Sequence, residues 1–195
     1  MQKLTRTDLL SLESYSQQRG DYRQRVLEHK QHRKLHLGAN ATLYFEDRLT
    51  IQYQIQEMLR IEKIFELDGI EEELNAYNPL IPDGQNLKAT FMLEFEEPAQ
   101  RQVALQQLVG IESQIWLQVE GFDKVYAIAD EDLERTTSDK TSAVHFLRFE
   151  LDKDMIAALR RPAASLAMGS DHQAYRHSLP VITESSRNSL LNDLD

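Results

Sequence analysis

The polar residues that could most readily take part in catalysis or ligand binding lie in residues 45–65, which have the sequence FEDRLTIQYQIQEMLRIEKIF. This segment is predicted to run from the end of a strand into a long helix. At the helical period its apolar residues form one arc, which consists of Ile51, Ile55, Met58, Leu59, Ile61 and Phe65. Gln54 and Glu62 fall within that arc, where an amide or a carboxylate must find a polar partner. The segment therefore predicts a polar site.

Three charged residues of this helix could carry out chemistry at such a site. Glu57 and Arg60, three residues apart, are spaced to pair on one helix face. Desolvation would disfavour the ionised form of Glu62 unless a cation or a metal lay beside it. Glu62 is therefore either a ligand or general acid–base group, or a structural carboxylate. As a structural group it would pair with Arg148 or Lys140, or reach solvent, and ion-pair networks of that kind are common.

A second group of acids follows a predicted strand in the sequence DEDLER. It consists of Asp130, Glu131, Asp132 and Glu134. Closely spaced carboxylates can hold Mg²⁺ or Ca²⁺, because hard cations prefer oxygen ligands. The spacing differs from that of the calcium-binding loop, which needs a glycine at its centre. A solvated turn at the start of a helix explains the same acids, since helix N-termini favour negative charge.

Histidines give the third set of candidates. His145 is predicted on the apolar side of a central strand, where a lone histidine is more often a hydrogen-bonded core residue than a ligand. Arg148 lies on the other face of that strand and could pair with the central helix. His29 lies on a helix face with His32, but the helix is predicted to end before His36. The candidate metal ligands are therefore Glu57, Glu62, His29 and His145.

The N-terminal region combines basic charge with aromatic residues. Residues 1–36 hold eight lysines and arginines against four acids, within a chain of net charge −10. One helical stripe contains Tyr15, Arg19, Tyr22, Val26, His29 and Arg33. Such a stripe can bind nucleic acid. It can equally pack its rings on a core while the arginine stems extend to solvent. We favour packing, because the chain as a whole is acidic.

Composition excludes several classes of protein. The 195 residues, 41% of them hydrophobic, are sufficient for one soluble domain with a core of its own. No apolar run is long enough to span a membrane, and no secretion signal is recognisable, so we expect a cytoplasmic protein without a membrane partner. The absence of cysteine excludes disulfides and thiolate chemistry from this chain. The sequence contains neither a phosphate-binding glycine loop nor the nucleophile elbow of serine hydrolases. It therefore indicates no particular cofactor.

Alternating and helical patterns predict an α+β fold with a mainly antiparallel sheet of about six strands and helices packed around it. The first element is a long N-terminal helix over residues 5–33, which Gly20 could bend. Two hairpins pair residues 34–37 with 41–46, and 115–119 with 124–129. Single strands are expected near residues 88–95 and 142–151. Trp116 on a polar strand face should contact a helix or a neighbouring chain, and in the second case the protein would be a homo-oligomer.

The chain is predicted to form one α+β domain over residues 1–162. Residues 163–195 are expected to provide a linker, at 163–170, and a C-terminal helix that docks on the same domain. Thr183 is the predicted N-cap of that helix, and Leu190, Leu191 and Leu194 are its docking face.

Five motifs together resemble a bacterial family of proteins, domain-of-unknown-function family 3501. They are LTRTDLLSLESY, FEDRLTIQYQIQEMLRIEKIF, ELNAYNPLIPDGQNLKATFMLE, AIADEDLER and DKTSAVHFLRFEL. The similarity runs from Leu4 to Leu151 and continues in HQAYRHSLPVI and the last helix. The family brings no established catalytic residues. Its genes often lie near those for rubrerythrin-like and iron–sulfur oxidoreductase proteins, so the resemblance implies a link to redox or peroxide defence.

Two functions follow as expectations. The first is a cytoplasmic accessory or interaction protein that works with an iron–sulfur or rubrerythrin-like redox protein. The alternative is a small metal-dependent enzyme with a carboxylate and histidine site. The candidate polar site comprises Gln54, Glu57, Arg60, Glu62, Asp130, Asp132, Glu134, Lys140, His145 and Arg148. One condition joins these residues: Glu57 or Glu62 should lie within reach of the acidic turn, Lys140, His145 or Arg148.

Overall fold

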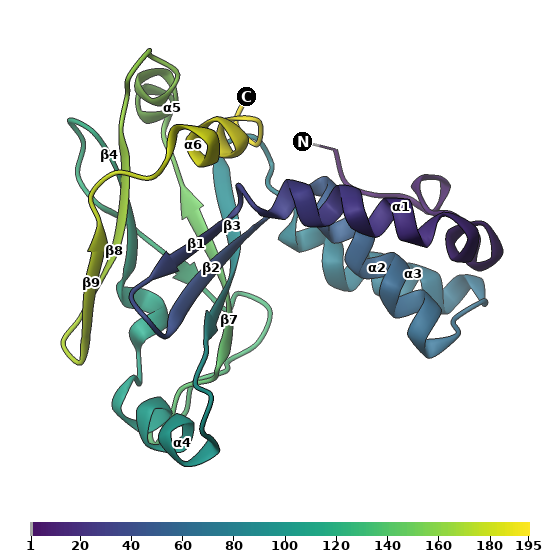
Figure 1. Ribbon diagram of the computed structural model, residues 1–195, viewed down its shortest axis with the longest axis horizontal. Helices are drawn as coiled ribbons and strands as arrows, with labels where there is room; N and C mark the ends of the chain where they lie inside the picture. The colour runs from purple at the N-terminus through teal and green to yellow at the C-terminus, as the bar shows by residue number, and fades with distance from the viewer. Residues whose placement is uncertain (1) are drawn as a thin grey trace.

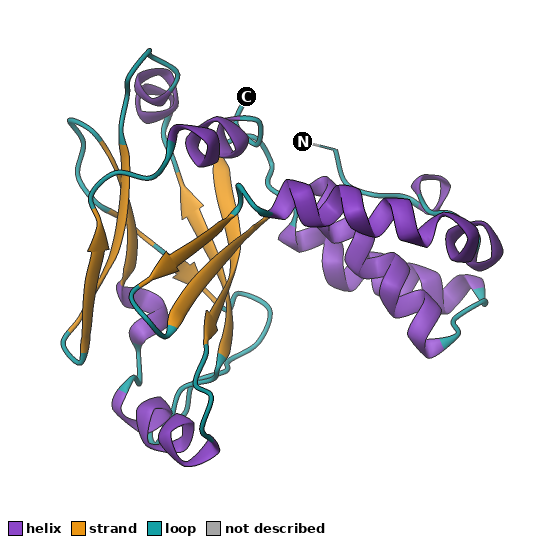
Figure 2. Cartoon of the chain, in the orientation of Figure 1, coloured by secondary structure: helices purple, strands orange, loops and turns teal. Residues whose placement is uncertain are grey.

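The computed structural model describes residues 2–195 and divides into a helical lobe and a pair of β-sheets (Figure 1). The lobe contains three helices, α1 (Leu12–Lys30), α2 (Arg48–Glu62) and α3 (Leu67–Tyr77). It extends to one side of the sheets, and the strands lie together on the other side (Figure 2). None of the helices in the described part of the chain is long and apolar enough to cross a membrane.

Within residues 2–195 the strands form one five-stranded and one four-stranded sheet, and every pairing between named strands is antiparallel. The first sheet has the order β1 (Lys34–Leu37), β2 (Ala41–Glu46), β3 (Asn86–Leu93), β7 (Val144–Glu150) and β6 (Ile128–Ala129). The second has the order β5 (Val125–Tyr126), β4 (Ile115–Val119), β8 (Leu166–His172) and β9 (Tyr175–Leu179).

Short helices cover the ends of the sheets. Helix α4 (Pro98–Gln107) lies at one end, and α5 (Lys153–Leu159) and α6 (Glu184–Leu191) lie at the other (Figure 1). Three 3₁₀ turns complete the chain: η1 (Arg6–Asp8), η2 (Asn78–Leu80) and η3 (Ile111–Gln114). Thr183 caps α6 by accepting a hydrogen bond from the Ser186 backbone, which confirms the predicted cap.

Two separate hydrophobic clusters hold the fold together. The larger lies between the sheets, because alternate residues of β2, β3, β4, β7 and β8 point inward. The smaller lies in the lobe and contains Leu4, Ile51, Ile55, Leu59, Leu74 and Ile81. The outer face of the five-stranded sheet is turned toward the lobe and is only half-buried, as the alternating burial of β3 and β7 shows.

The predicted α+β class and antiparallel pairing are confirmed, and so is the first hairpin. Three details were wrong. The N-terminal helix spans 19 residues, fewer than predicted, and is not interrupted at Gly20. The strands form two sheets instead of one sheet of about six strands. Most of the predicted linker at 163–170 belongs to β8, an inner strand of the second sheet. The sequence did not predict this strand, because Gly169 and Ser170 interrupt its alternation of apolar and polar residues.

Trp116 is covered by its own sheet. The residue is 6% exposed, and the Lys124 ammonium lies 4.2 Å from the centre of its ring. The neighbouring strand approaches the indole at Gly169, where a Cβ atom would collide with the ring. Strand β8 and Lys124 therefore cover Trp116 in place of the helix that the sequence analysis offered, and Trp116 gives no support to a homo-oligomer.

Candidate functional site

Glu57 is the centre of an ion-pair cluster between α1 and α2. Its carboxylate accepts hydrogen bonds from the Tyr15 hydroxyl at 2.7 Å and from the Arg19 guanidinium at 2.8 and 2.9 Å. Arg60 donates from one helical turn away at 3.2 Å, so the predicted pair forms. The hydrogen bonds from Arg19, and then those from Tyr15 and Arg60, lower the pKa of Glu57 to about 2 although burial opposes the shift. This cluster joins two helices.

The other two polar residues predicted on α2 are not buried. Gln54 and Glu62 are both exposed, and Ile61 and Phe65 of the predicted apolar arc are 59% and 65% exposed. The buried amide of this helix is Gln56, which accepts from the Leu10 backbone N–H at 2.6 Å. The condition on Glu57 and Glu62 is therefore not met. Neither residue reaches the acidic turn, Lys140, His145 or Arg148, since the partners of Glu57 lie in the lobe and Glu62 faces solvent.

The structure does bring Asp130 and His145 together, in the core between the sheets. His145 is fully buried, and its Nδ1 lies 2.6 Å from the Asp130 carboxylate. Asp130 also accepts from the Phe146 backbone N–H at 3.0 Å and from Arg135 at 3.2 Å. To reach these donors Asp130 adopts a φ of 52°, a left-handed conformation that is unfavourable for a residue with a side chain.

Threonine hydroxyls extend this network to a second carboxylate. His145 Nε2 lies 2.9 Å from the Thr141 hydroxyl, which donates to Glu112 at 3.1 Å. Thr136 also donates to Glu112, at 2.8 Å. A carboxylate, a histidine and a hydroxyl joined in that order by hydrogen bonds resemble the catalytic site of an enzyme with a hydroxyl nucleophile. Here, however, Thr141 is only 2% exposed, and neither it nor His145 lines the adjacent cavity of about 530 Å³. The network therefore acts as a buried support for the turn.

Two further acids of the acidic turn pair with arginines at the surface. Asp132 accepts from Arg135 at 2.5 and 2.6 Å, and Glu131 accepts from Arg148 at 2.8 and 2.9 Å. Glu134 and Lys140 are exposed and lie outside these contacts. DEDLER is therefore a surface turn, but the prediction that it starts a helix was wrong, because the next element is strand β7.

His29 also has a structural partner. Its Nε2 lies 2.5 Å from the carboxylate of Asp47, the residue that caps α2 by accepting from the Thr50 backbone N–H. Across residues 2–195, no three side chains of the metal-binding types are grouped closely enough to hold an ion. The four candidate ligands, Glu57, Glu62, His29 and His145, lie in four different surroundings.

The aromatic and basic stripe of α1 packs inside the protein. Tyr15 and Val26 are buried, and the Tyr22 ring stacks on Tyr53 of α2 with 6.0 Å between centroids. Arg33 is 1% exposed and donates to the backbone carbonyls of Phe45 and Glu46 and to the Asp193 carboxylate. These contacts occupy the stripe, as the packing interpretation predicted.

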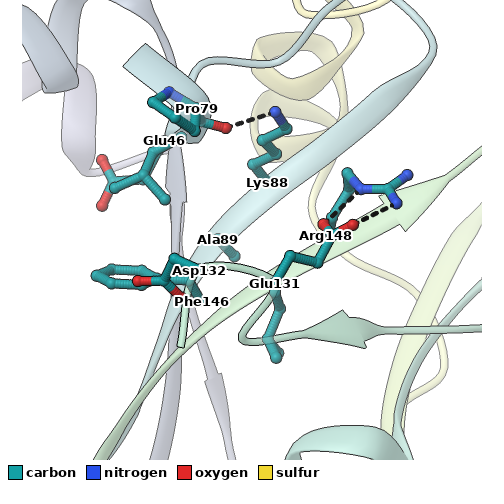
Figure 3. Close-up of a pocket in the computed structure, with 10 residues that line it drawn as sticks. Glu46, Pro79, Lys88, Ala89, Glu131, Asp132, Phe146 and Arg148 are labelled. Carbon is teal, nitrogen blue, oxygen red and sulfur yellow. Dashed lines mark hydrogen bonds and ion pairs between the residues drawn. The ribbon is translucent and has the colours of Figure 1, made fainter. Parts of the chain in front are cut away.

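Sequence reasoning missed a cleft between the lobe and the outer face of the five-stranded sheet. Two adjoining cavities of about 80 and 360 Å³ share the lining residues Glu46, Leu80 and Phe146. Glu46, at the end of β2, is 8% exposed although it carries a carboxylate. Figure 3 shows this carboxylate pointing away from Lys88 and Arg148. The only sequence signal was the alternation of β2, which places Glu46 on the outer face.

The distal end of the lobe carries an apolar groove. It has a volume of about 810 Å³ and is lined by side chains from three segments: Arg6, Thr7, Leu9, Leu10, Ser11, Leu12, Leu59, Ile64, Phe65, Ile70 and Glu71. Phe65, which lines the groove, is 65% exposed, and its sequence neighbours Ile61 and Leu67 are 59% and 53% exposed. We call the groove with these three residues the lobe tip. Exposed apolar residues that gather in this way are typical of a binding surface.

Comparison with known proteins adds a family and a structural neighbour. A family model described as a protein of unknown function (DUF3501) matches residues 3–194. A crystal structure of a protein of unknown function from Burkholderia pseudomallei is 52% identical, with a TM-score of 0.94 over 100% of both chains. No curated protein sequence matches the chain. The predicted family resemblance is confirmed, and it extends through the last helix.

Proposed function

The chain belongs to the DUF3501 family, and from its surface we propose that it is a cytoplasmic accessory protein that binds a partner protein at the lobe tip. The observation that carries the proposal is the exposure of Ile61, Phe65 and Leu67 around an apolar groove. Leaving such side chains in water is unfavourable, and a partner that covers them gains free energy in proportion to the apolar area buried.

The charge around the groove indicates what kind of partner would fit. Residues 62–73 contain the acids Glu62, Glu66, Asp68, Glu71, Glu72 and Glu73 and a single basic residue, Lys63. Burial, together with the charges of Glu62 and Glu72, raises the pKa of Glu73, so the acids repel one another. A basic amphipathic helix would place apolar residues in the groove and relieve this repulsion. The proposed occupant is such a helix on the partner protein.

The proposed partner is an iron–sulfur or rubrerythrin-like redox protein. This step rests on the gene neighbourhood that the family resemblance implies. Because the chain has no cysteine, any iron–sulfur cluster would belong to the partner. The accessory protein would then supply a docking surface, and the partner would carry out the electron transfer.

The test uses the purified chain and a purified redox protein encoded beside its gene, titrated by calorimetry at two salt concentrations. Phe65→Ser should weaken binding about tenfold or more, because hot-spot residues at an interface centre contribute most of the affinity. Val181→Ser is the matched control, since Val181 is also 65% exposed but follows strand β9, outside the helical lobe. Higher salt should weaken binding through the acidic rim.

Three results would count against the proposal. They are a complete lack of binding, equal losses in the two variants, and self-association of the chain through Phe65, which would make a second copy the occupant. The metal-dependent enzyme has no comparable observation in its favour, because its candidate residues are separated: Glu57, His29 and His145 are engaged in structural contacts, and Glu62 is exposed.

A further inference from the structure

We propose a second binding site, independent of the lobe tip: the cleft around Glu46 binds a small organic amine, with its ammonium on the Glu46 carboxylate and its apolar part against the cleft wall. The starting observation is that Glu46 is 8% exposed and lies at the junction of the two cavities. A carboxylate removed from water normally has a cationic partner, because desolvation of an isolated charge is costly.

Glu46 lacks that partner. Its two carboxylate oxygens accept hydrogen bonds from the hydroxyls of Thr90, at 2.8 Å, and Thr50, at 2.6 Å. Among residues 2–195, none of the ion pairs between a carboxylate and a lysine, arginine or histidine nitrogen involves Glu46. Hydroxyls supply hydrogen bonds without compensating the charge. The negative charge is therefore available to a cation that enters the cleft.

The two lysines of the cleft do not take this role. Lys88 is opposite Glu46 in the β2–β3 register, but its ammonium donates to the backbone carbonyl of Pro79 at 2.6 Å (Figure 3) and to that of Ile81 at 3.0 Å. Burial lowers the pKa of Lys88. Lys30 lines the larger cavity from α1 but is half-buried and makes no ion pair with Glu46.

The walls of the larger cavity fit an apolar or aromatic group. They are formed by Tyr44 and Phe146 of the sheet, by Ile51 and Tyr77 of the lobe helices, and by Leu80 and Met92. Tyr44 of β2 and Phe146 of β7 are the register partners of Thr90 on either side of β3. The two aromatic side chains therefore flank Thr90, whose hydroxyl donates to Glu46. Aromatic faces also stabilise a nearby cation through their quadrupoles. The volume of about 360 Å³ suits a ligand with about ten non-hydrogen atoms.

The probe is 2-phenylethylamine, titrated by calorimetry and by amide chemical-shift changes at pH 7.5. Its neutral analogue 2-phenylethanol, its trimethylammonium derivative and phenylacetate form the comparison series. The amine should bind about tenfold or more tightly than the alcohol, because only the amine places a charge on Glu46. The trimethylammonium compound should bind less tightly than the amine, since it has no N–H to donate. Phenylacetate should not bind.

Glu46→Gln should weaken amine binding about 30-fold or more while the alcohol binds as before, since a buried charge pair is lost. Glu94→Gln is the matched control: Glu94 also accepts from a threonine hydroxyl of β2, at 2.6 Å, but it is exposed and outside both cavities. In the absence of ligand, Glu46→Gln should raise the melting temperature, because it removes an uncompensated buried charge.

Several outcomes would overturn the amine site. Equal affinity for the amine and the alcohol would mean an apolar cavity without charge recognition. An unchanged affinity in Glu46→Gln would place the amine elsewhere. A lower melting temperature in both Glu46→Gln and Lys30→Gln would show that Lys30 already serves as the counter-ion. The proposal instead predicts that Lys30→Gln binds the amine at least as tightly as the original chain does.

Discussion

Glu57 and Glu46 belong to the same segment of sequence, yet their environments are opposite. Glu57 accepts from Arg19, Tyr15 and Arg60, so its charge is compensated. Glu46 accepts from hydroxyls alone. The difference lies in the partners, which come from residues far away in the chain. One carboxylate therefore stabilises the fold, and the other is left available for a ligand.

The compensation of Glu57 predicts a dependence of stability on pH. Its pKa in the folded protein is about 2, below the ordinary 4.5. The stabilisation is therefore fully present above pH 4.5 and is lost as the pH falls toward 2. Glu57→Gln should lower the free energy of unfolding by about 2 kcal/mol at pH 7, the magnitude of hydrogen bonds to a charged group.

Urea unfolding of the original chain and of Glu57→Gln at pH 7 and pH 3 measures this effect. The difference between the two proteins should shrink at pH 3. Glu62→Gln is the control on the same helix, and it should change little because Glu62 is exposed. A difference that stays constant between pH 7 and pH 3 would argue against the ion-pair explanation.

At the scale of secondary-structure elements, replacing a glycine with alanine should have opposite effects on stability at two positions. A Cβ at Gly20, within α1, meets nothing within 4 Å. A Cβ at Gly169, within β8, would lie 2.7 Å from the His177 carbonyl oxygen and would collide with the Trp116 ring. Gly20→Ala should raise the stability by about 0.5–1 kcal/mol, because glycine is unfavourable inside a helix. Gly169→Ala should lower it, since overpacking costs about 1–3 kcal/mol.

Thermal unfolding followed by circular dichroism can rank the two alanine variants against the original chain. The expected order is Gly20→Ala, the original chain, then Gly169→Ala. If Gly169→Ala were as stable as the original chain, strand β8 could not be packed against Trp116 and the His177 carbonyl as described.

Secondary structure was predictable where local patterns decide it, and less so elsewhere. The hairpin of β1 and β2 followed from alternation and a glycine turn, and the final helix from Thr183 and its leucines. The apolar arc predicted for α2 was wrong near the C-terminal end of the helix. The helix ends there because Lys63 adopts a left-handed conformation with a φ of 54°. Phe65 therefore left the predicted arc.

Within the candidate site, the sequence predicted only the contacts between residues that are close together in the chain. Glu57 and Arg60 lie one turn apart and pair as expected. Asp130 and His145 were both singled out, but nothing local showed that they touch, since 15 residues separate them. Gln56 is buried because the chain near Leu10 crosses α2, a contact over 46 residues. Glu46 was missed because its burial depends on the lobe lying over the sheet.

At the scale of the whole molecule, Arg33 joins the lobe to the sheets. It follows α1 and contacts the carbonyls of Phe45 and Glu46, where β2 leads into α2, and also Ser189 and Asp193 near the end of the chain. Burial raises the pKa of Asp193 to about 6, although Arg33 opposes the shift. The guanidinium is therefore what allows Asp193 to stay charged at this junction.

Arg33→Met should lower the free energy of unfolding by about 3 kcal/mol or more, because it removes the guanidinium that donates to a buried carboxylate and three backbone carbonyls. The double variant Arg33→Met with Asp193→Leu should cost less than the two single costs added together, since the unpaired charge is removed too. Urea denaturation of the four proteins gives the coupling. Strict additivity would mean that the pair contributes nothing to this junction.

Trp116 has a practical consequence for spectroscopy. It is the single tryptophan of the chain, and it is 6% exposed on β4 with Lys124 against its ring. Fluorescence excited selectively in tryptophan therefore reports on the four-stranded sheet alone. Far-ultraviolet circular dichroism near 222 nm is dominated by helices, of which α1, α2 and α3 are the longest. The two signals together follow the two halves of the molecule in one sample, without an added dye.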